Sequence, residues 1–139
     1  MSRNTAHCYY ELIDGDIHTF TLLQNSERAI NEWLSTMSEL YDALLDGLGG
    51  DLSKHDGPIH ILIRVKPRIV PLGYLLYAYN RWEKRHPQRL NAHVAVLYRA
   101  GMLIPILGRI TSVVRSTDMI RFFGDNEREE AVKWLRTTD

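Results

Sequence analysis

The sequence predicts a single α/β domain with a mostly parallel sheet, and three observations lead to this prediction. Short apolar runs rich in β-branched residues alternate with longer runs of helical period after residue 25. The connections between these runs are short, which favours right-handed crossovers between parallel strands. Two β-prone runs at the start are separated by a turn sequence, which predicts an antiparallel hairpin at one edge of the sheet.

The hairpin is predicted from "HCYYELI" and "IHTFTLL", because the intervening "DGD" places Asp14 and Gly15 where a tight turn needs positive φ. A helix follows, with Asn25 or Ser26 as its cap and "GLGG" at its end. Its apolar residues recur at helical spacing: Ile30, Trp33, Leu34, Met37, Leu40, Leu44, Leu45 and Leu48.

The later elements alternate regularly. "IHILIRV" and "AHVAVLY" predict buried strands, and a helix between them begins near Pro71 and stops before Pro87. A helical stripe over 103–116 is followed by the strand "MIRFF" and by a final helix in "GDNEREEAVKWL", capped by Asp125 or Asn126. The order ββαβαβαβα predicts four or five strands and about four helices in one domain over residues 1–139.

Composition fits such a domain. A chain of 139 residues with 45% hydrophobic and 24% charged residues is typical of a globular protein. Cys8 is the single cysteine, and the start "MSRNTAHC" lacks the apolar core of a signal peptide, so we expect a cytoplasmic protein without disulfides. The longest apolar stretches are far shorter than the roughly 20 residues that span a bilayer.

Charge is balanced overall but unevenly distributed. Residues 1–63 contain three basic and ten acidic side chains, whereas residues 64–99 contain eight basic and one acidic. Within the basic segment, Arg64, Lys66 and Arg68 follow one predicted parallel strand, and Arg99 follows the next. Ligands bind at the carboxyl ends of parallel strands, so these four residues predict an anion-binding edge. The alternative is that they are solvated charges that end buried strands.

The predicted helix after Pro71 has a second distinctive face, opposite its leucines. This face carries aromatic and basic residues: Tyr74, Tyr77, Arg81, Lys84 and Arg85. Tyrosine and arginine are enriched in protein interfaces, so the face predicts a protein partner or a homodimer, with a merely solvated helix face as the alternative. A nucleic-acid ligand is disfavoured because no RNP, KH or helix-turn-helix pattern accompanies these residues.

No catalytic residue, metal site or cofactor site is predicted. The chain lacks a GxSxG elbow and phosphate-binding loops, and the spacing of its six histidines is not that of metal ligands. His60 and His93 are each the second residue of a predicted strand, so they lie side by side if the strands are neighbours. Asp14 and Asp16 are explained by their place in the turn.

Three segments resemble the STAS (anti-sigma-factor antagonist) family, particularly its SpoIIAA-like members. They are "ILIRVKPRIVPLGYLL", "VAVLYRAGMLIPILGRI" and "IRFFGDNEREEAVKWL". The resemblance spans nearly the whole chain and implies a non-enzymatic regulatory or protein-interaction module. Its members usually carry a phosphorylatable Ser or Thr just before the glycine of the second helix. Here Val70, Pro71 and Leu72 precede Gly73, so that phosphorylation switch is absent.

The resemblance also leaves an alternative function open. SpoIIAA-like folds are similar to lipid-transfer domains of the CRAL-TRIO type. This similarity implies a carrier or sensor for an anionic or lipid-like small molecule, with an apolar cleft beneath the second and third helices. The predicted basic edge would then meet the head group of that ligand.

Overall fold

The computed structural model describes residues 2–4, 8–24, 26–55, 57–66, 72–86, 90–98 and 119–137. The predicted helix at 103–116 lies outside the described residues. The described elements are, in order, β1 (Ser2–Asn4), β2 (Cys8–Ile13), β3 (Ile17–Leu22), α1 (Glu27–Gly47), the 3-10 turn η1 (Leu52–Lys54), β4 (Ile59–Val65), α2 (Leu72–Arg85), β5 (Ala92–Tyr98), β6 (Met119–Gly124) and α4 (Arg128–Thr137).

The strands form one mixed sheet in the spatial order β1-β2-β3-β4-β5-β6. β1, β2 and β3 are antiparallel neighbours, whereas β3, β4, β5 and β6 run parallel. The α/β class, the N-terminal hairpin and the mostly parallel sheet are thereby confirmed. β1 adds a strand that the sequence does not predict, because three residues are too few to show an alternating pattern.

The turn between β2 and β3 has the conformation that its sequence favours. Asp14 and Gly15 have φ values of 53° and 76°, in the left-handed region that glycine and aspartate tolerate best. The Asp16 N–H donates to the Ile13 carbonyl at 3.1 Å and closes the loop. The turn therefore fixes the register that pairs Ile13 with Ile17.

Helix α1 begins and ends at the predicted signals. The Ser26 hydroxyl accepts a hydrogen bond from the Ala29 N–H at 3.1 Å, which satisfies one of the unpaired donors of the first turn. At the other end, Gly50 adopts a φ of 82° and its N–H donates to the Leu45 carbonyl at 3.0 Å. Ser26, one of the two predicted caps, is thus the N-cap of α1.

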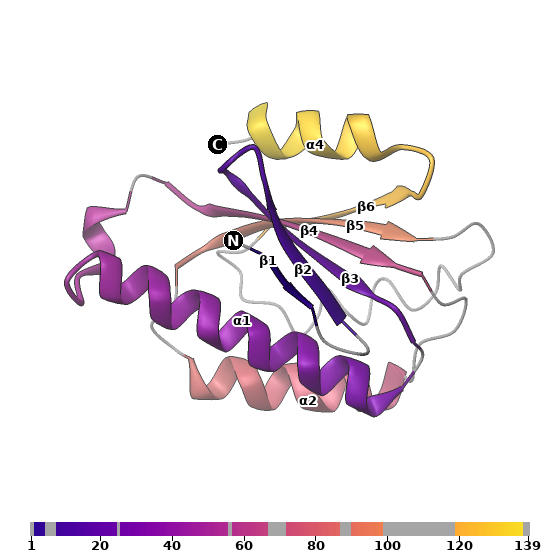
Figure 1. Ribbon diagram of the computed structural model, residues 1–139, viewed down its shortest axis with the longest axis horizontal. Helices are drawn as coiled ribbons and strands as arrows, with labels where there is room; N and C mark the ends of the chain where they lie inside the picture. The colour runs from indigo at the N-terminus through magenta and orange to yellow at the C-terminus, as the bar shows by residue number, and fades with distance from the viewer. Residues whose placement is uncertain are drawn as a thin grey trace.

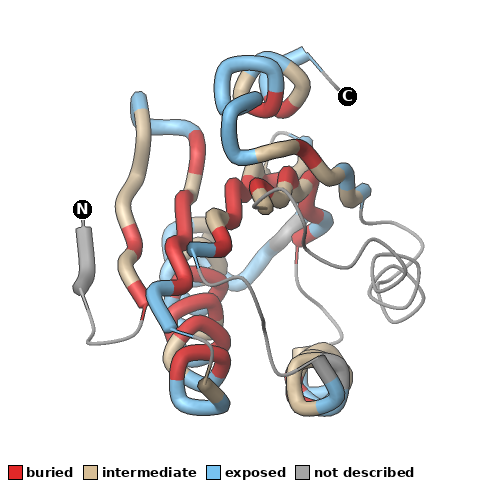
Figure 2. The backbone as a smooth tube through the Cα atoms, turned by 90° about the vertical axis from the view of Figure 1, so that its right-hand side faces the viewer, coloured by how far each residue is buried: buried red, intermediate tan, exposed pale blue. Residues whose placement is uncertain are grey.

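Helices cover both faces of the sheet, with α1 and α2 on one side and α4 on the other (Figure 1). We call these sides the α1/α2 face and the α4 face. Side chains alternate between them along a strand, so the central strands β3, β4 and β5 contribute to two apolar cores. Figure 2 shows buried residues along the central strands and on the inner side of α1. The core on the α4 face consists of Ile17, Leu62, Ala95, Leu97, Phe123, Ala131 and Leu135.

The start of α4 differs from the prediction. The helix begins at Arg128, after a turn in which the Glu127 carboxylate accepts from the Gly124 N–H at 2.8 Å. The Glu127 N–H donates to the Gly124 carbonyl at 2.9 Å. Asp125 and Asn126 therefore lie in the turn before the helix, two or more residues from its first residue, and are not at the cap position that was predicted for them. A Cβ at Gly124 would lie 2.8 Å from Asn126 Oδ1, so the Asn126 side chain would have to move to accommodate a larger residue.

Candidate interaction surface

The outward face of α2 carries a cluster of two tyrosines and an arginine. Tyr74, Tyr77 and Arg81 are spaced by three and four residues, so they lie on one side of the helix. The ring centroids of Tyr74 and Tyr77 are 6.3 Å apart. Arg81 Nη1 donates to the Tyr77 hydroxyl at 3.0 Å, and the guanidinium carbon lies 5.5 Å from the ring centroid. Tyr77 is 56% exposed, so the helix offers solvent an ordered tyrosine–arginine pair.

Two further basic residues extend this cluster towards the end of α2. Lys84 and Arg85 are exposed in its last turn, where positive charge also stabilises the negative end of the helix dipole. The five residues predicted to form an interface therefore belong to one helix face. Tyr74 differs from the rest, because it is half-buried and its hydroxyl donates to Asn31 Oδ1 of α1 at 2.5 Å.

Helices α1 and α2 pack side by side and run in the same direction. Trp82 Nε1 donates to Ser38 Oγ at 2.8 Å, and the ring centroids of Trp33 and Tyr79 are 6.1 Å apart. The Tyr74 bond to Asn31 lies two turns before the Trp82 bond to Ser38 on both helices. These contacts fix the register of the two helices.

The outward face of α1 has the opposite charge to that of α2. Its exposed charged residues are four acids and one base: Glu27, Arg28, Glu39, Asp42 and Asp46. This acidic face was not identified from the sequence as a candidate surface. The excess of acidic residues over 1–63 was the available signal, but the helix register is needed to show that the acids lie beside the basic face of α2.

The structure describes half of the predicted anion-binding edge. Arg64 is half-buried near the end of β4, and Lys66 is exposed just beyond that strand. Arg64 lies on the α4 face, because it follows Leu62 at an interval of two and Leu62 belongs to the core under α4. The Lys66 N–H donates to the Leu22 carbonyl at 3.1 Å, at the carboxyl end of β3. Arg68 and Arg99 lie outside the described residues, so the convergence of all four stays a prediction.

His60 and His93 are neighbours, as their equal positions in two strands predict. They are paired in the register of β4 and β5, and their ring centroids are 6.1 Å apart. His93 is 4% exposed, its ring centroid lies 6.2 Å from that of Trp134 of α4, and its buried Nδ1 has no hydrogen-bond partner among the residues that the structure describes. Burial lowers the pKa of His60, and the neighbouring His93 lowers it further. His60 is thus biased towards its neutral form.

A third histidine lies on the opposite face of the sheet. His18 Nδ1 and the Tyr10 hydroxyl are 2.8 Å apart and share a hydrogen bond. Burial, followed by the positive charge of His55 and His60, lowers the pKa of His18 to about 4. The folded protein therefore disfavours protonation of His18, which makes its stability depend on pH.

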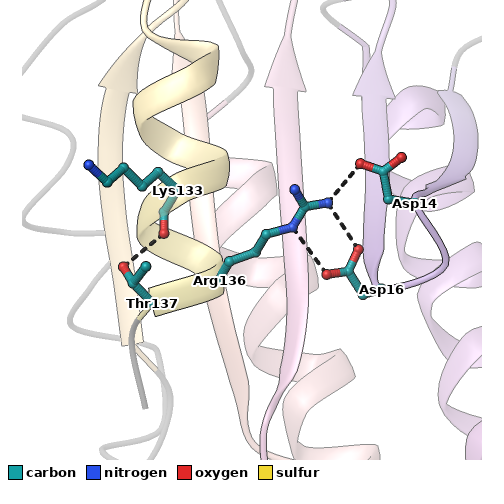
Figure 3. A network of polar contacts seen from close by, with 5 residues as sticks. All are labelled: Asp14, Asp16, Lys133, Arg136 and Thr137. Carbon is teal, nitrogen blue, oxygen red and sulfur yellow. Dashed lines mark hydrogen bonds and ion pairs between the residues drawn. The ribbon is translucent and has the colours of Figure 1, made fainter.

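The hairpin turn is joined to α4 by ion pairs that the sequence does not reveal. Arg136 Nη2 donates to Asp14 Oδ2 at 2.8 Å, and Arg136 Nε donates to Asp16 Oδ2 at 3.2 Å (Figure 3). Both aspartates raise the pKa of the guanidinium. In the sequence, their place in the turn was sufficient to explain Asp14 and Asp16. About 120 residues separate them from Arg136, so no local pattern indicated these ion pairs.

Cys8 is not suited to nucleophilic chemistry. Its side chain is 2% exposed and belongs to the core on the α1/α2 face. Burial, with a smaller contribution from the charge of Glu32, raises the pKa of the Cys8 thiol to about 12. The thiol is therefore protonated near neutral pH, whereas the thiolate is the reactive form.

Within the described part of the chain, no three histidine, cysteine or carboxylate side chains are grouped as a metal site. None of the described helices combines the length and the apolar character needed to cross a bilayer. The face of α2, with its Tyr77–Arg81 pair, is accordingly the most distinctive described surface. Comparison of the chain with protein-family models, with curated proteins and with solved structures found no match.

Proposed function

We propose that this chain is a non-enzymatic, STAS-like regulatory module of the cytoplasm that binds a protein partner through the outward face of α2. The observation that carries the proposal is the Tyr77–Arg81 pair: Tyr77 is 56% exposed, and its hydroxyl accepts a hydrogen bond from Arg81 Nη1 at 3.0 Å. Tyrosine and arginine dominate the energetic centres of protein interfaces. Because the pair is already ordered, less side-chain freedom is lost on binding.

Regulation by serine or threonine phosphorylation of the turn before α2 does not belong to this proposal. Val70, Pro71 and Leu72 have no hydroxyl group, so a kinase has no acceptor there. In this proposal the unmodified side chains of the α2 face bind the partner. Its hydroxyl groups belong to Tyr74, which is engaged with α1, and to Tyr77, which accepts from Arg81.

Site-specific photocrosslinking in cells tests this function. A photoreactive amino acid in place of Tyr77 should give covalent adducts with a partner protein. The same amino acid in place of Lys133, which is exposed on α4, is the matched control. Adducts at position 77 should disappear when Arg81→Glu is added. Equal adducts at the two positions, or none at position 77, would contradict the proposal.

A second candidate function is an anionic-ligand carrier or sensor. It is favoured by the position of Lys66, whose N–H bonds Leu22 where β3 leads into the amino terminus of α1. An exposed ammonium group at this edge is suited to an anionic head group. Arg64 points to the other face of the sheet from α1, which makes the protein-interaction function the stronger of the two.

A further inference from the structure

We propose that the partner of the α2 face is a second copy of this chain, which places its acidic α1 face on the basic α2 face of the first. The inference rests on the proposed function of α2 and adds the identity of the partner and the geometry of the contact. It is carried by the charges of the two helices, by their register, and by the symmetry that would bring them together.

The two outward faces are complementary in charge. The exposed charged residues of α2 are Arg81, Lys84 and Arg85, all of them basic. Those of α1 comprise four acids and one base, as described above. With the α1 face at −3 and the α2 face at +3, the helix pair has no net charge on these exposed residues but a strong separation of charge. Such a surface attracts another copy of itself and disfavours like-charged alignments.

The charges also lie at matching heights. The hydrogen bond from Trp82 to Ser38 shows that these two residues lie at the same height along the two parallel helices. Arg85 is three residues beyond Trp82, so it lies at about the height of residues 41 and 42 along α1, the second of which is Asp42. Asp46 lies one further turn along α1. The basic and acidic clusters therefore occupy the same end of the helix pair.

One two-fold arrangement uses this match. If the symmetry axis runs between the helices and parallel to them, rotation keeps every residue at its height and places α1 of one copy over α2 of the other. The acidic face of α1 in each copy then meets the basic face of α2 in the other copy, so the dimer contains two equivalent contacts. An axis perpendicular to the helices would instead set α1 against α1 and α2 against α2, where like charges repel.

Tyr77 supplies the apolar part of this contact. It is the most exposed large apolar side chain of the described residues, and it lies two turns before Arg85 on the same helix face. Exposed ion pairs add little affinity one by one, so the charges chiefly select the orientation of the dimer. The buried ring would provide the affinity.

Charge reversal tests the pairing directly. The α1 variant carries Asp42→Lys with Asp46→Lys, and the α2 variant carries Arg81→Glu with Lys84→Glu. Each should raise the dimer dissociation constant by roughly a hundredfold or more, because like charges then meet at both contacts. Sedimentation velocity over a range of concentrations measures this constant. Asp125→Lys with Glu129→Lys, on the α4 side, is the matched control and should leave it unchanged.

The decisive samples restore complementarity. An equimolar mixture of the α1 and α2 variants should form a heterodimer, identified by its mass in native mass spectrometry. A single chain that carries all four substitutions should regain the homodimer. Thermal melting of every variant shows that a lost dimer is not a lost fold.

Three results would overturn the inference: a wild-type protein that stays monomeric, an α1 variant that dimerises as tightly as the wild type, or a mixture without heterodimer. The crosslinking experiment separates this failure from that of the proposed function. Adducts at position 77 with a different protein would support the proposed interaction function and would show that the partner is not a second copy of this chain. An absence of adducts together with a monomeric wild type would contradict both the interaction function of α2 and the second copy as its partner.

Discussion

His18 should make the stability of the protein depend on pH in a mildly acidic window. The imidazole shares a hydrogen bond with the Tyr10 hydroxyl at 2.8 Å and is half-buried on the α1/α2 face. Burial is the main reason that the pKa of His18 falls to about 4, and the positive charge of His55 and His60 adds to it. An unfolded chain has no such environment, so its histidine titrates near 6.5.

The sign follows from proton binding. Between pH 6.5 and 4 the unfolded chain binds a proton at His18 that the folded protein does not, so the free energy of unfolding decreases as the pH falls. Protonation of His18 does not reduce the free energy of unfolding above the unfolded pKa of 6.5. Below that pH the free energy of unfolding decreases progressively until the folded pKa of about 4 is reached. At about 1.4 kcal/mol for each pKa unit, the loss is about 2 kcal/mol at pH 5 and about 3 kcal/mol at pH 4.

Urea unfolding followed by tryptophan fluorescence between pH 7 and 4 measures this loss. His18→Gln removes the titrating group but keeps a polar side chain beside Tyr10, so its stability should fall less steeply than that of the wild type. Tyr10→Phe is the control: it should lower stability by about 1 kcal/mol at each pH and keep the wild-type slope, because burial is the main cause of the shift. If wild type and His18→Gln lose equal free energy over this range, the reasoning is refuted.

Three further changes test other parts of the structure. Ser26→Ala should lower the free energy of unfolding by about 1 kcal/mol through loss of the α1 cap, whereas Ser35→Ala, exposed within the same helix, should not; urea unfolding compares them. Arg136→Ala should lower the melting temperature slightly in dilute buffer and not in molar salt, because the ion pairs to the hairpin turn are exposed; a salt-independent decrease would contradict this. If the predicted basic edge binds anions, phosphate should raise the melting temperature relative to chloride at equal ionic strength, and Lys66→Ala with Arg99→Ala should abolish the difference. Equal shifts in wild type and double variant would exclude that site.

Local signals allowed most of the described elements to be predicted. The β4 and β5 strands coincide with the runs "IHILIRV" and "AHVAVLY", because β-branched residues bounded by polar or helical segments leave little ambiguity. Ser26 marks the start of α1, and the end of α2 at Arg85 agrees with the restriction that Pro87 places on His86. Equal positions in two parallel strands were sufficient to pair His60 with His93.

Features that depend on distant parts of the chain could not be predicted. The ion pairs of Arg136 with Asp14 and Asp16 require α4 to lie across the sheet from the hairpin, and no local pattern states which face a terminal helix covers. The charge match between Asp42 and Arg85 likewise requires the register of α1 and α2, which the Trp82 bond to Ser38 fixes. The five residues of the α2 face were predictable because they belong to one helix.

The place of α4 in the chain has a consequence for biosynthesis. α1 and α2 are made before β5 and β6, so their side of the sheet can be covered while the strands are still being added. α4 is made after the six described strands, and until then Leu62, Ala95 and Phe123 lack the helix that buries them. Exposed apolar surface of this kind makes incomplete chains prone to aggregation. We therefore expect the nascent protein to be most prone to aggregation in the interval between the synthesis of β6 and the docking of α4.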